Sequence, residues 1–447
     1  MWWTLGIGFA NAFCGAYVGE AGAELTSGVG QVAIVRQGTR TTLTVSNDFS
    51  SNVANFAMLV PVPEVLGPED VHVIDPAVFG HLDVYSGPRL VSYTCDELYP
   101  EVPRRSYGIG CSETSLIFDD PVPNRPDDDD VDVEARFIVG EYEIMILDAT
   151  QSGALLGWLD DEGFAVETTQ AGLIQAYLDA GSYFFAARVD TSKLLDGQPS
   201  LSPLSFGYDS EVFGLPIRLG TGNSPGAQDL VIYAITDPEA GRVGISNYPE
   251  RTVEDECLFD GEPQVFGDFY RDAWAAGASD TGDATWVAEY GWNVTPFGAQ
   301  CDPCPPTETQ VPLPFADLVA LGFVGATGTP DSGGFTQASY YFTRLRTRYT
   351  PAQASQDLAL YTSGITDNTQ QRYVQHEAYL EDAFPVCGSG WVAMKDAGSC
   401  KFESNEMRHR VNYWRRQDDG AGCDHGGAVW VGFLGLLAAA GLRRRPR

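Results

Sequence analysis

The amino-acid sequence predicts an α+β protein that is mostly antiparallel β, with sandwich-like or meander sheets and a few short helices. The 447-residue chain contains 49 glycines, 27 prolines, 20 tyrosines and 23 phenylalanines but only 5 methionines, a composition typical of short strands and turns. Several segments also alternate apolar and polar residues, as half-buried strands do. A chain of this length can bury a large core and form roughly two to four domains.

The first segment has features of a signal peptide. An apolar stretch from Trp2 to Phe9 precedes Ala10-Asn11-Ala12, a small-x-small cleavage pattern. The positively charged start of such peptides is missing, which leaves a buried first strand as the alternative. We predict a signal peptide over residues 1–12 and export of the remaining chain.

The next segments predict strands. The stretch QVAIVRQGTRTTLTVSND is typical of two strands joined at Gln37-Gly38. NFAMLVPVPE predicts a continuous apolar strand that stops at Pro61 and Pro63, because proline cannot donate to a β-ladder. The prolines and like charges of residues 119–136 resist packing and predict an acidic linker. Its aspartates 127–130 could bind calcium, but they lack the spacing of a calcium loop, and a solvated linker is favoured.

Two helices are expected after a strand at VGEYEIMILDA. SGALLGWLDDEGF predicts a short one. TTQAGLIQAYLDAG predicts a longer one, with Leu173, Ile174, Tyr177 and Leu178 on one face and Gly181 as its stop. Strands then resume at SYFFAARVD, GLPIRLG, QDLVIYAIT and RVGISNY, with the spacing of an antiparallel meander, and later at ATWVAEYGWNV and YYFTRLRTRYT.

The last of these strands carries a row of arginines. Arg344, Arg346 and Arg348 recur at period two, so a strand would project all three from one face. Such a row could bind a ligand that bears carboxylate or phosphate groups. Pairing with Asp or Glu on neighbouring strands is favoured, because the chain is strongly acidic.

The net charge of −34 excludes some partners. Such a charge repels nucleic-acid phosphates, so we expect no nucleic-acid partner. It suits a soluble surface protein or one that collects divalent cations. The sequence predicts no cofactor and leaves only calcium open.

The cysteines predict disulfides in an exported protein. Nine are present, and Cys423 belongs to the C-terminal tail, which leaves an even number for pairing. The eight candidates are Cys14, Cys95, Cys111, Cys257, Cys301, Cys304, Cys387 and Cys400. The pairs Cys95/Cys111 and Cys387/Cys400 are favoured by proximity in sequence, while Cys257 would take Cys301 or Cys304 and Cys14 the other.

Two motifs could belong to an enzyme. GNSPG places Ser224 in a G-x-S-x-G pattern, but Pro225 cannot supply the oxyanion-hole N–H and a strand follows, which favours a hairpin turn. Cys301 and Cys304 form a C-x-x-C that two prolines follow without a helix, which favours disulfides over redox or zinc chemistry. We therefore assign no catalytic and no metal-binding residue.

Several segments together resemble a bacterial family. FCGAYVG, NFAMLVPVPE, YEIMILDATQSGALLGWLDDEGF, LPIRLGTGNSPGAQDLVIYAI, EYGWNVTPFGAQCDPCP and FTRLRTRYTP follow the order and spacing of the domain of unknown function 2330. The resemblance runs from about Phe13 to about Cys387. It implies exported bacterial proteins with no established activity, and it supplies no catalytic residues.

The C-terminal tail resembles the sorting signals of myxobacteria. Cys423 and glycines precede the apolar run 428–442 and an arginine cluster. That run would form about 22 Å of helix, whereas a membrane span needs about 30 Å, so it is a marginal transmembrane helix with its arginines inside. In such tails a protease removes the helix and the protein stays at the cell surface through the cysteine.

These observations predict an exported, cell-surface-anchored protein of the outer envelope. We favour a structural or binding module that contacts envelope polymers, other cells or ions, with an exported hydrolase or thiol-redox enzyme as the alternative. The predicted parts are the signal peptide (1–12), an N-terminal β-rich part (13–118), the acidic linker (119–136), a central α+β part (137–255), a C-terminal cysteine-containing β-rich part (256–422) and the sorting tail (423–447).

Overall fold

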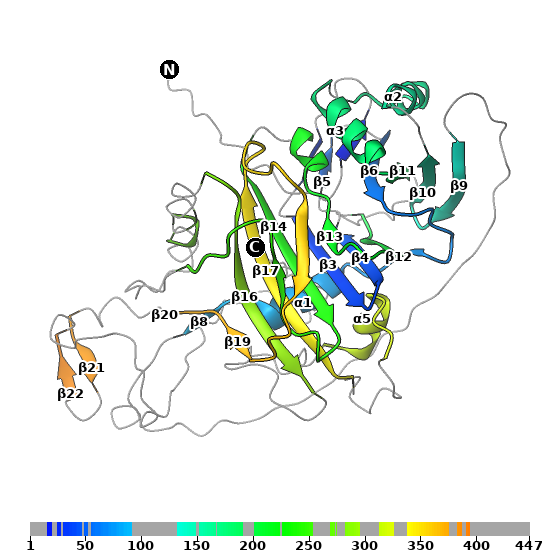
Figure 1. The fold of residues 1–447 in the computed structure, drawn as a ribbon. Coiled ribbons are helices and arrows are strands. Elements are labelled where there is room, and N and C mark those ends of the chain that lie inside the picture. Colours follow the sequence, from blue (N-terminus) through cyan, green and yellow to red (C-terminus); the bar gives the residue numbers. More distant parts are fainter. Residues whose placement is uncertain are drawn as a thin grey trace, which may run out of the picture.

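The computed structural model of the protein shows two β-sheets packed face to face, with helices on both outer sides (Figure 1). The strand-rich α+β fold class predicted from the sequence is confirmed. The structure describes residues 16–19, 25–27, 30–46, 49–51, 55–91, 132–148, 152–166, 168–190, 201–223, 226–253, 269–272, 274, 282–295, 313–325, 338–374, 382–386 and 390–393.

The larger sheet has eight strands. Their order is β19 (Thr369–Gln370), β16 (Thr285–Val294), β17 (Tyr340–Tyr349), β14 (Gln228–Thr236), β3 (Gly30–Gln37), β4 (Arg40–Ser46), β12 (Leu204–Asp209) and β7 (Val71–Val73). Neighbours are antiparallel except β14 and β3, which run parallel. The predicted hairpin between β3 and β4 is present, and Gly38 at its turn has a φ of 59°, which glycine adopts without a steric penalty.

The smaller sheet has five antiparallel strands. Their order is β1 (Ala16–Gly19), β6 (Asn55–Val62), β11 (Tyr183–Asp190), β10 (Tyr142–Asp148) and β9 (Asp132–Val139). Of the two prolines predicted to stop this strand, Pro61 does not, because β6 continues through it, whereas the strand ends at Val62, directly before Pro63. Pairing with β1 stops at Leu59, so Pro61 has a strand neighbour on one side only, where its missing N–H is tolerated.

The inner faces of the two sheets form the main core. Alternate residues of each strand point inward, as the period of two requires, and nearly all of these side chains are apolar and fully buried. Phe185 of β11 stacks on Phe206 of β12 with ring centroids 5.0 Å apart, which joins the two sheets directly.

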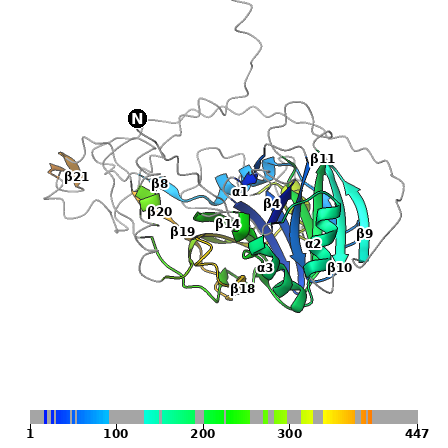
Figure 2. The ribbon, with the colours of Figure 1, turned by 90° about the horizontal axis from the view of Figure 1, so that it is seen from above.

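Helices cover the outer faces. α2 (Ser152–Asp161) and α3 (Thr168–Asp179), both predicted, pack on the five-stranded sheet, and Ile174 and Tyr177 face it as expected. α1 (Ala77–Ser86) and the short α5 (Phe315–Ala320), which the sequence analysis missed, pack on the eight-stranded sheet. Seen from above, α1 lies on the side of β14, and α2 and α3 lie on the side of β10 (Figure 2).

The predicted antiparallel meander is wrong. Its four segments are divided among three sheets: β11 joins the five-stranded sheet and β14 the eight-stranded one, whereas β13 (Gly214–Leu215) and β15 (Val243–Ile245) pair with β18 (Leu358–Thr362) in a sheet of three. The reason is that β14 inserts between β17 and β3, which lie far from it in the sequence. The 3-10 helix η2 (Leu219–Asn223) separates β13 from β14, and these two strands lie in different sheets and do not form a hairpin with each other. Ser224 and Pro225 of the G-x-S-x-G motif lie outside the described residues.

Three strand pairs complete the described fold. They are β2 (Leu25–Ser27) with β5 (Phe49–Ser51), β8 (Arg89–Val91) in parallel with β20 (Arg372–Val374), and β21 (Phe384–Val386) with β22 (Gly390–Val392).

The predicted parts of the chain interleave in this sandwich. The eight-stranded sheet combines strands from the N-terminal part, such as β3, with β14 from the central part and β17 from the C-terminal part. The predicted linker reaches into the fold as well, because β9 begins at Asp132. The rest of that linker lies outside the described residues.

Several predicted features also fall outside the described residues. These are the signal peptide, the aspartates 127–130, Ser224, all nine cysteines and the C-terminal tail. Within the part that the structure describes, none of the helices is long and apolar enough to cross a membrane.

Candidate functional site

The three arginines of β17 lie on the outer face of the eight-stranded sheet. Leu345 and Tyr349 of the same strand point into the main core, so Arg344, Arg346 and Arg348 face away from it. The period of two therefore places the row as the sequence predicts from strand geometry. Each arginine lies within ion-pair distance of a carboxylate.

Glu289 reaches Arg344 through an irregularity in β16. The register between β16 and β17 shifts between Ala288 and Tyr290, so that Ala288 lies opposite Leu345, Tyr290 lies opposite Arg344, and Glu289 is the extra residue of a β-bulge. Bulges re-aim a side chain and interrupt the ladder. Here the bulge directs a carboxylate, fully buried at 0% exposure, toward a guanidinium on the next strand.

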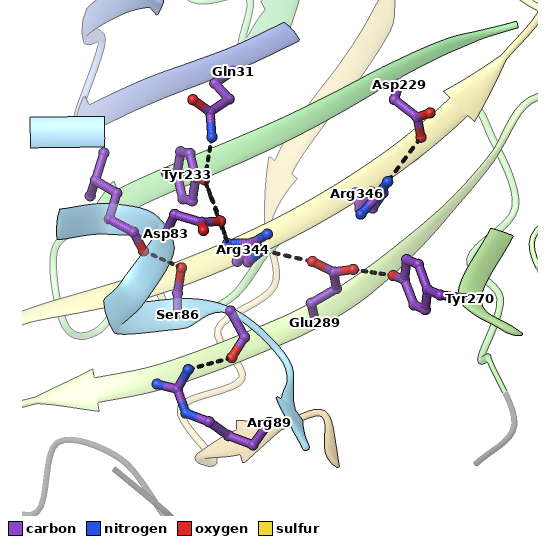
Figure 3. A network of polar contacts seen from close by, with 12 residues as sticks. Gln31, Asp83, Ser86, Arg89, Asp229, Tyr233, Tyr270, Glu289, Arg344 and Arg346 are labelled. Carbon is purple, nitrogen blue, oxygen red and sulfur yellow. Dashed lines mark hydrogen bonds and ion pairs between the residues drawn. The ribbon is translucent and has the colours of Figure 1, made fainter. Parts of the chain in front are cut away.

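Arg344 joins two carboxylates from different elements (Figure 3). Its Nε donates to Oε2 of Glu289 at 2.6 Å, and its Nη1 donates to Oδ1 of Asp83 on α1 at 2.7 Å. The Arg344 side chain is 6% exposed, whereas that of Asp83 is 44% exposed. Of the three side chains, Asp83 is therefore the one that contacts solvent.

Two tyrosines extend the network. The hydroxyl of Tyr233 on β14 donates to Oδ1 of Asp83 at 3.3 Å and accepts from Nε2 of Gln31 on β3 at 3.0 Å. The hydroxyl of Tyr270 donates to Oε1 of Glu289. Both carboxylate oxygens of Glu289 therefore accept a hydrogen bond, which a buried charge requires.

The electrostatics keep Arg344 positively charged. Burial by itself lowers the pKa of its guanidinium, but interactions with Tyr233, Glu289 and Asp83 outweigh burial and raise that pKa above its ordinary value. Burial, followed by the charge of Glu289, raises the pKa of Tyr270 well above its usual range. At neutral pH the Arg344 guanidinium is therefore charged and the Tyr270 hydroxyl is a neutral donor.

The other two arginines share one carboxylate. Arg346 Nη2 lies 3.3 Å from Oδ1 of Asp229, and Arg348 Nη1 lies 3.5 Å from its Oδ2. Arg346 also places its guanidinium carbon 5.0 Å from the centre of the Tyr270 ring. Asp229 lies on β14 directly opposite Arg348, which explains how a single aspartate serves both.

The end of α1 is held so that Asp83 stays in place. Ser86 Oγ donates to the carbonyl of Leu82, and Arg89 donates from Nη2 to the carbonyl of Tyr85 and from Nη1 to that of Gly87. These bonds satisfy terminal helix carbonyls, and a cation is favourable at a helix C-terminus. The helix end is therefore fixed one turn from Asp83.

This network holds α1, β14, β16 and β17 together through ion pairs and hydrogen bonds. Its charged members, Asp83, Asp229, Glu289 and the three arginines, are equal in number of negative and positive groups and pair with one another. His72 contacts the carbonyl of Ala320 and His81 contacts Asp317, both elsewhere. Among the described residues no group of three His, Cys, Asp or Glu side chains could hold a metal ion.

Sequence reasoning found the arginines but missed Glu289 and Asp83. A signal existed for both. Glu289 is a lone charge inside the apolar strand ATWVAEYGWNV, and Asp83 follows Val78, Phe79 and Leu82, which have helical spacing. Neither signal predicts that the carboxylate pairs with Arg344, because the bulge and the position of α1 depend on the tertiary structure.

Comparison with known proteins gives the family alone. No curated protein matches the chain, and no solved structure matches it. The family model described as "uncharacterized protein conserved in bacteria (DUF2330)" matches residues 9–361, from before β1 to within β18. It includes the eight-stranded sheet apart from β19, and with it the whole arginine network. The chain therefore belongs to the bacterial DUF2330 family.

Proposed function

We propose that the protein is exported, held at the cell surface by its tail near Cys423, and acts as a binding module for cationic groups on envelope polymers or on other cells. Export and anchoring rest on the sequence of the two ends. The binding role rests on the charge of the folded part.

The observation that supports this role is that many carboxylates of the described part are exposed, whereas its arginines lie against carboxylates or are partly buried. The exposed acidic residues of the described part are Glu69, Asp75, Asp148, Asp160, Asp161, Asp179, Asp209, Glu211, Glu239, Glu250, Asp272, Asp283, Asp367 and Asp382. Its exposed arginines, Arg40, Arg136 and Arg271, each lie within 4.0 Å of a carboxylate.

This division produces a strongly acidic surface. The arginines of β17 are buried or half-buried against carboxylates, and all three lysines lie outside the described residues. A surface with excess negative charge attracts cationic partners and speeds their association. A rigid sandwich with a fixed interior presents such a surface without rearrangement.

Binding to polylysine-coated beads tests the proposal directly. We expect the full chain to bind these beads at about 0.1 M salt, to be released at about 1 M salt as screening increases, and to ignore polyglutamate-coated beads. Replacing Asp160 and Asp161, exposed at the end of α2, with asparagine should weaken binding, whereas the uncharged control Ser355→Ala should not. Equal binding to both kinds of bead, or binding that salt does not change, would reject the role.

The location is tested separately in the native host. Mass spectrometry of the surface fraction is expected to find a chain that lacks residues 1–12 and residues after Cys423. An intact chain recovered only from the cytoplasm would contradict export whatever the beads show.

A further inference from the structure

A second cluster lies on the outer face of the eight-stranded sheet, beyond Glu289. It contains Val253, Tyr270, Trp274, Val287 and Tyr373, and is here named the Tyr270 cluster. Figure 3 shows Tyr270 and Arg346 at this end of β16 and β17, away from Asp83 and α1. Val287 of β16 lies directly opposite Arg346 of β17 in the strand pair, so Arg346 lies at the edge of the cluster.

Two buried N–H donors at this cluster, one on Trp274 and one on the neighbouring Arg346, have no acceptor. Nε1 of Trp274 and Nε of Arg346 are both shielded from solvent and make no hydrogen bond. Trp274 is 2% exposed as a whole. Buried polar groups without a partner are rare in folded proteins, and each one points to strain or to a bound water or ion.

The surroundings favour an anion as the missing acceptor. Asp229 is shared between Arg346 and Arg348, and both oxygens of Glu289 already accept from Arg344 and Tyr270. Among the residues that the structure describes, the carboxylates that face Arg346 are therefore already paired. Both unsatisfied groups are N–H donors, and one of them belongs to a cation.

Two arginines lie over the two large rings of the cluster. The guanidinium carbon of Arg346 lies 5.0 Å from the Tyr270 ring centre, and that of Arg251 lies 4.8 Å from the Trp274 ring centre. The two rings meet edge to face with centres 6.4 Å apart. The cluster therefore brings two guanidinium groups, the donors that suit a planar or tetrahedral oxyanion, to one pair of aromatic rings.

The charge of Arg346 is retained in this setting. Burial lowers the pKa of its guanidinium, but interactions with Glu289, Tyr270 and Asp229 outweigh burial and raise it. Burial lowers the pKa of Arg251, so a bound anion would stabilise its charged form.

We propose that the Tyr270 cluster binds a small oxyanion, with Nε of Arg346 and Nε1 of Trp274 as its donors. The ligand class is a carboxylate, phosphate or sulfate group, free or carried by a larger molecule. The site is distinct from the acidic surface proposed above, and it gives the protein a means to hold anionic groups as well.

Calorimetric titration of the full chain with inorganic phosphate, sulfate and benzoate tests the site. We expect at least one of the three anions to bind. The anion that binds most tightly shows whether the site prefers a tetrahedral anion or a carboxylate. Trp274→Phe keeps an aromatic ring in the cluster but removes the donor. We expect it to weaken binding about tenfold, the usual effect of losing one hydrogen bond to a charged group.

The same variant separates binding from folding. Because Nε1 of Trp274 has no partner, Trp274→Phe is expected to leave the unfolding temperature of the anion-free protein unchanged or higher. Arg346→Gln should also lose anion binding. If Arg346→Gln fails to fold, the anion affinity of Trp274→Phe still tests the site.

Two matched controls lie elsewhere. Trp292→Phe changes a buried tryptophan of the same sheet, and Arg188→Gln removes an arginine that lies over the Phe164 ring, 5.8 Å from its centre. Neither should change anion affinity. No heat of binding for any of the three probes, or equal loss in Trp274→Phe and Trp292→Phe, would overturn the site. The result is independent of the polylysine beads, which report on the acidic surface.

Discussion

The two outer faces of the sandwich are closed in different ways. On the five-stranded sheet, α2 and α3 pack on apolar strand residues such as Leu59 and Met145, and Leu159 of α2 is buried among them. On the eight-stranded sheet, α1 and α5 cover aromatic residues such as Tyr290 and Phe342, and the face then continues into the arginine network.

Length explains the difference. β16 and β17 have ten residues each, or about 33 Å of strand, whereas the ten residues of α1 span about 15 Å. Further along this face, Tyr270 and Trp274 of the helical residues 269–272 and 274 pack on Val287. Between α1 and these residues lie the paired charges of Arg344, Glu289 and Asp83, here named the polar seal, which meets water at Asp83.

The largest expected effect is at the centre of that seal. Glu289→Ala leaves Arg344 buried with one carboxylate fewer and Tyr270 without its acceptor, so we expect the free energy of unfolding to fall by about 3–5 kcal/mol. Urea denaturation measures it. The exposed pair Arg136–Glu143 provides the control, since Glu143→Ala should cost less than about 1 kcal/mol.

A double variant sharpens the same point. Glu289→Leu with Arg344→Met replaces the pair by apolar groups of similar size and is expected to recover most of the lost stability. If the double variant were as unstable as Glu289→Ala, the apolar and charged ways of closing a face would not be interchangeable.

The next effect is on the apolar face. Leu159 of α2 is fully buried, and Leu159→Ala should lower the free energy of unfolding by about 3 kcal/mol, through lost burial and the cavity that remains. This loss should be the same at low and high salt. A loss that depends on salt would show that charge also stabilises this face.

Asp83→Asn is expected to cost about 1 kcal/mol, because this carboxylate is half exposed and its attraction to Arg344 is partly screened by water. The cost, followed by urea denaturation, should shrink as salt rises from about 0.1 M to about 1 M. A cost as large as that of Glu289→Ala would place Asp83 in the buried part of the seal.

The smallest effect depends on pH. Nδ1 of His81 on α1 lies 2.6 Å from Oδ2 of Asp317 on α5. The hydrogen bond to Asp317 raises the pKa of His81 above its ordinary value of 6.5, against the effect of burial, and the charges of Asp317 and of Asp75 beside α1 add to it. The folded state therefore binds the proton more tightly than the unfolded state.

The sign follows by linkage. This stabilisation is fully present below pH 6.5 and is lost as pH rises through the raised pKa of the folded protein. The difference in unfolding free energy between the wild type and His81→Gln should be larger at about pH 5.5 than at about pH 9, by up to about 1 kcal/mol. A difference that does not change with pH would remove the ion pair as its cause.

Much of the local structure could be predicted from the sequence. The period of two located β16, β17 and the row that contains Arg344, because alternation depends only on strand geometry. Helical spacing and a glycine stop located α3 in the same way. The apolar residues of α1 have equally good helical spacing, so this helix could have been predicted from the sequence but was missed.

What the sequence by itself determined is local: element types, the side of a strand on which a residue lies, the acidic balance and the family resemblance. Only the tertiary structure decided which strands meet, and therefore that the expected meander is three sheets. It also decided that Glu289 faces Arg344 across a bulge and that α1 brings Asp83 to the same guanidinium. The physical reason is that pairing joins residues far apart in the chain, and the pattern along one strand does not name its neighbour.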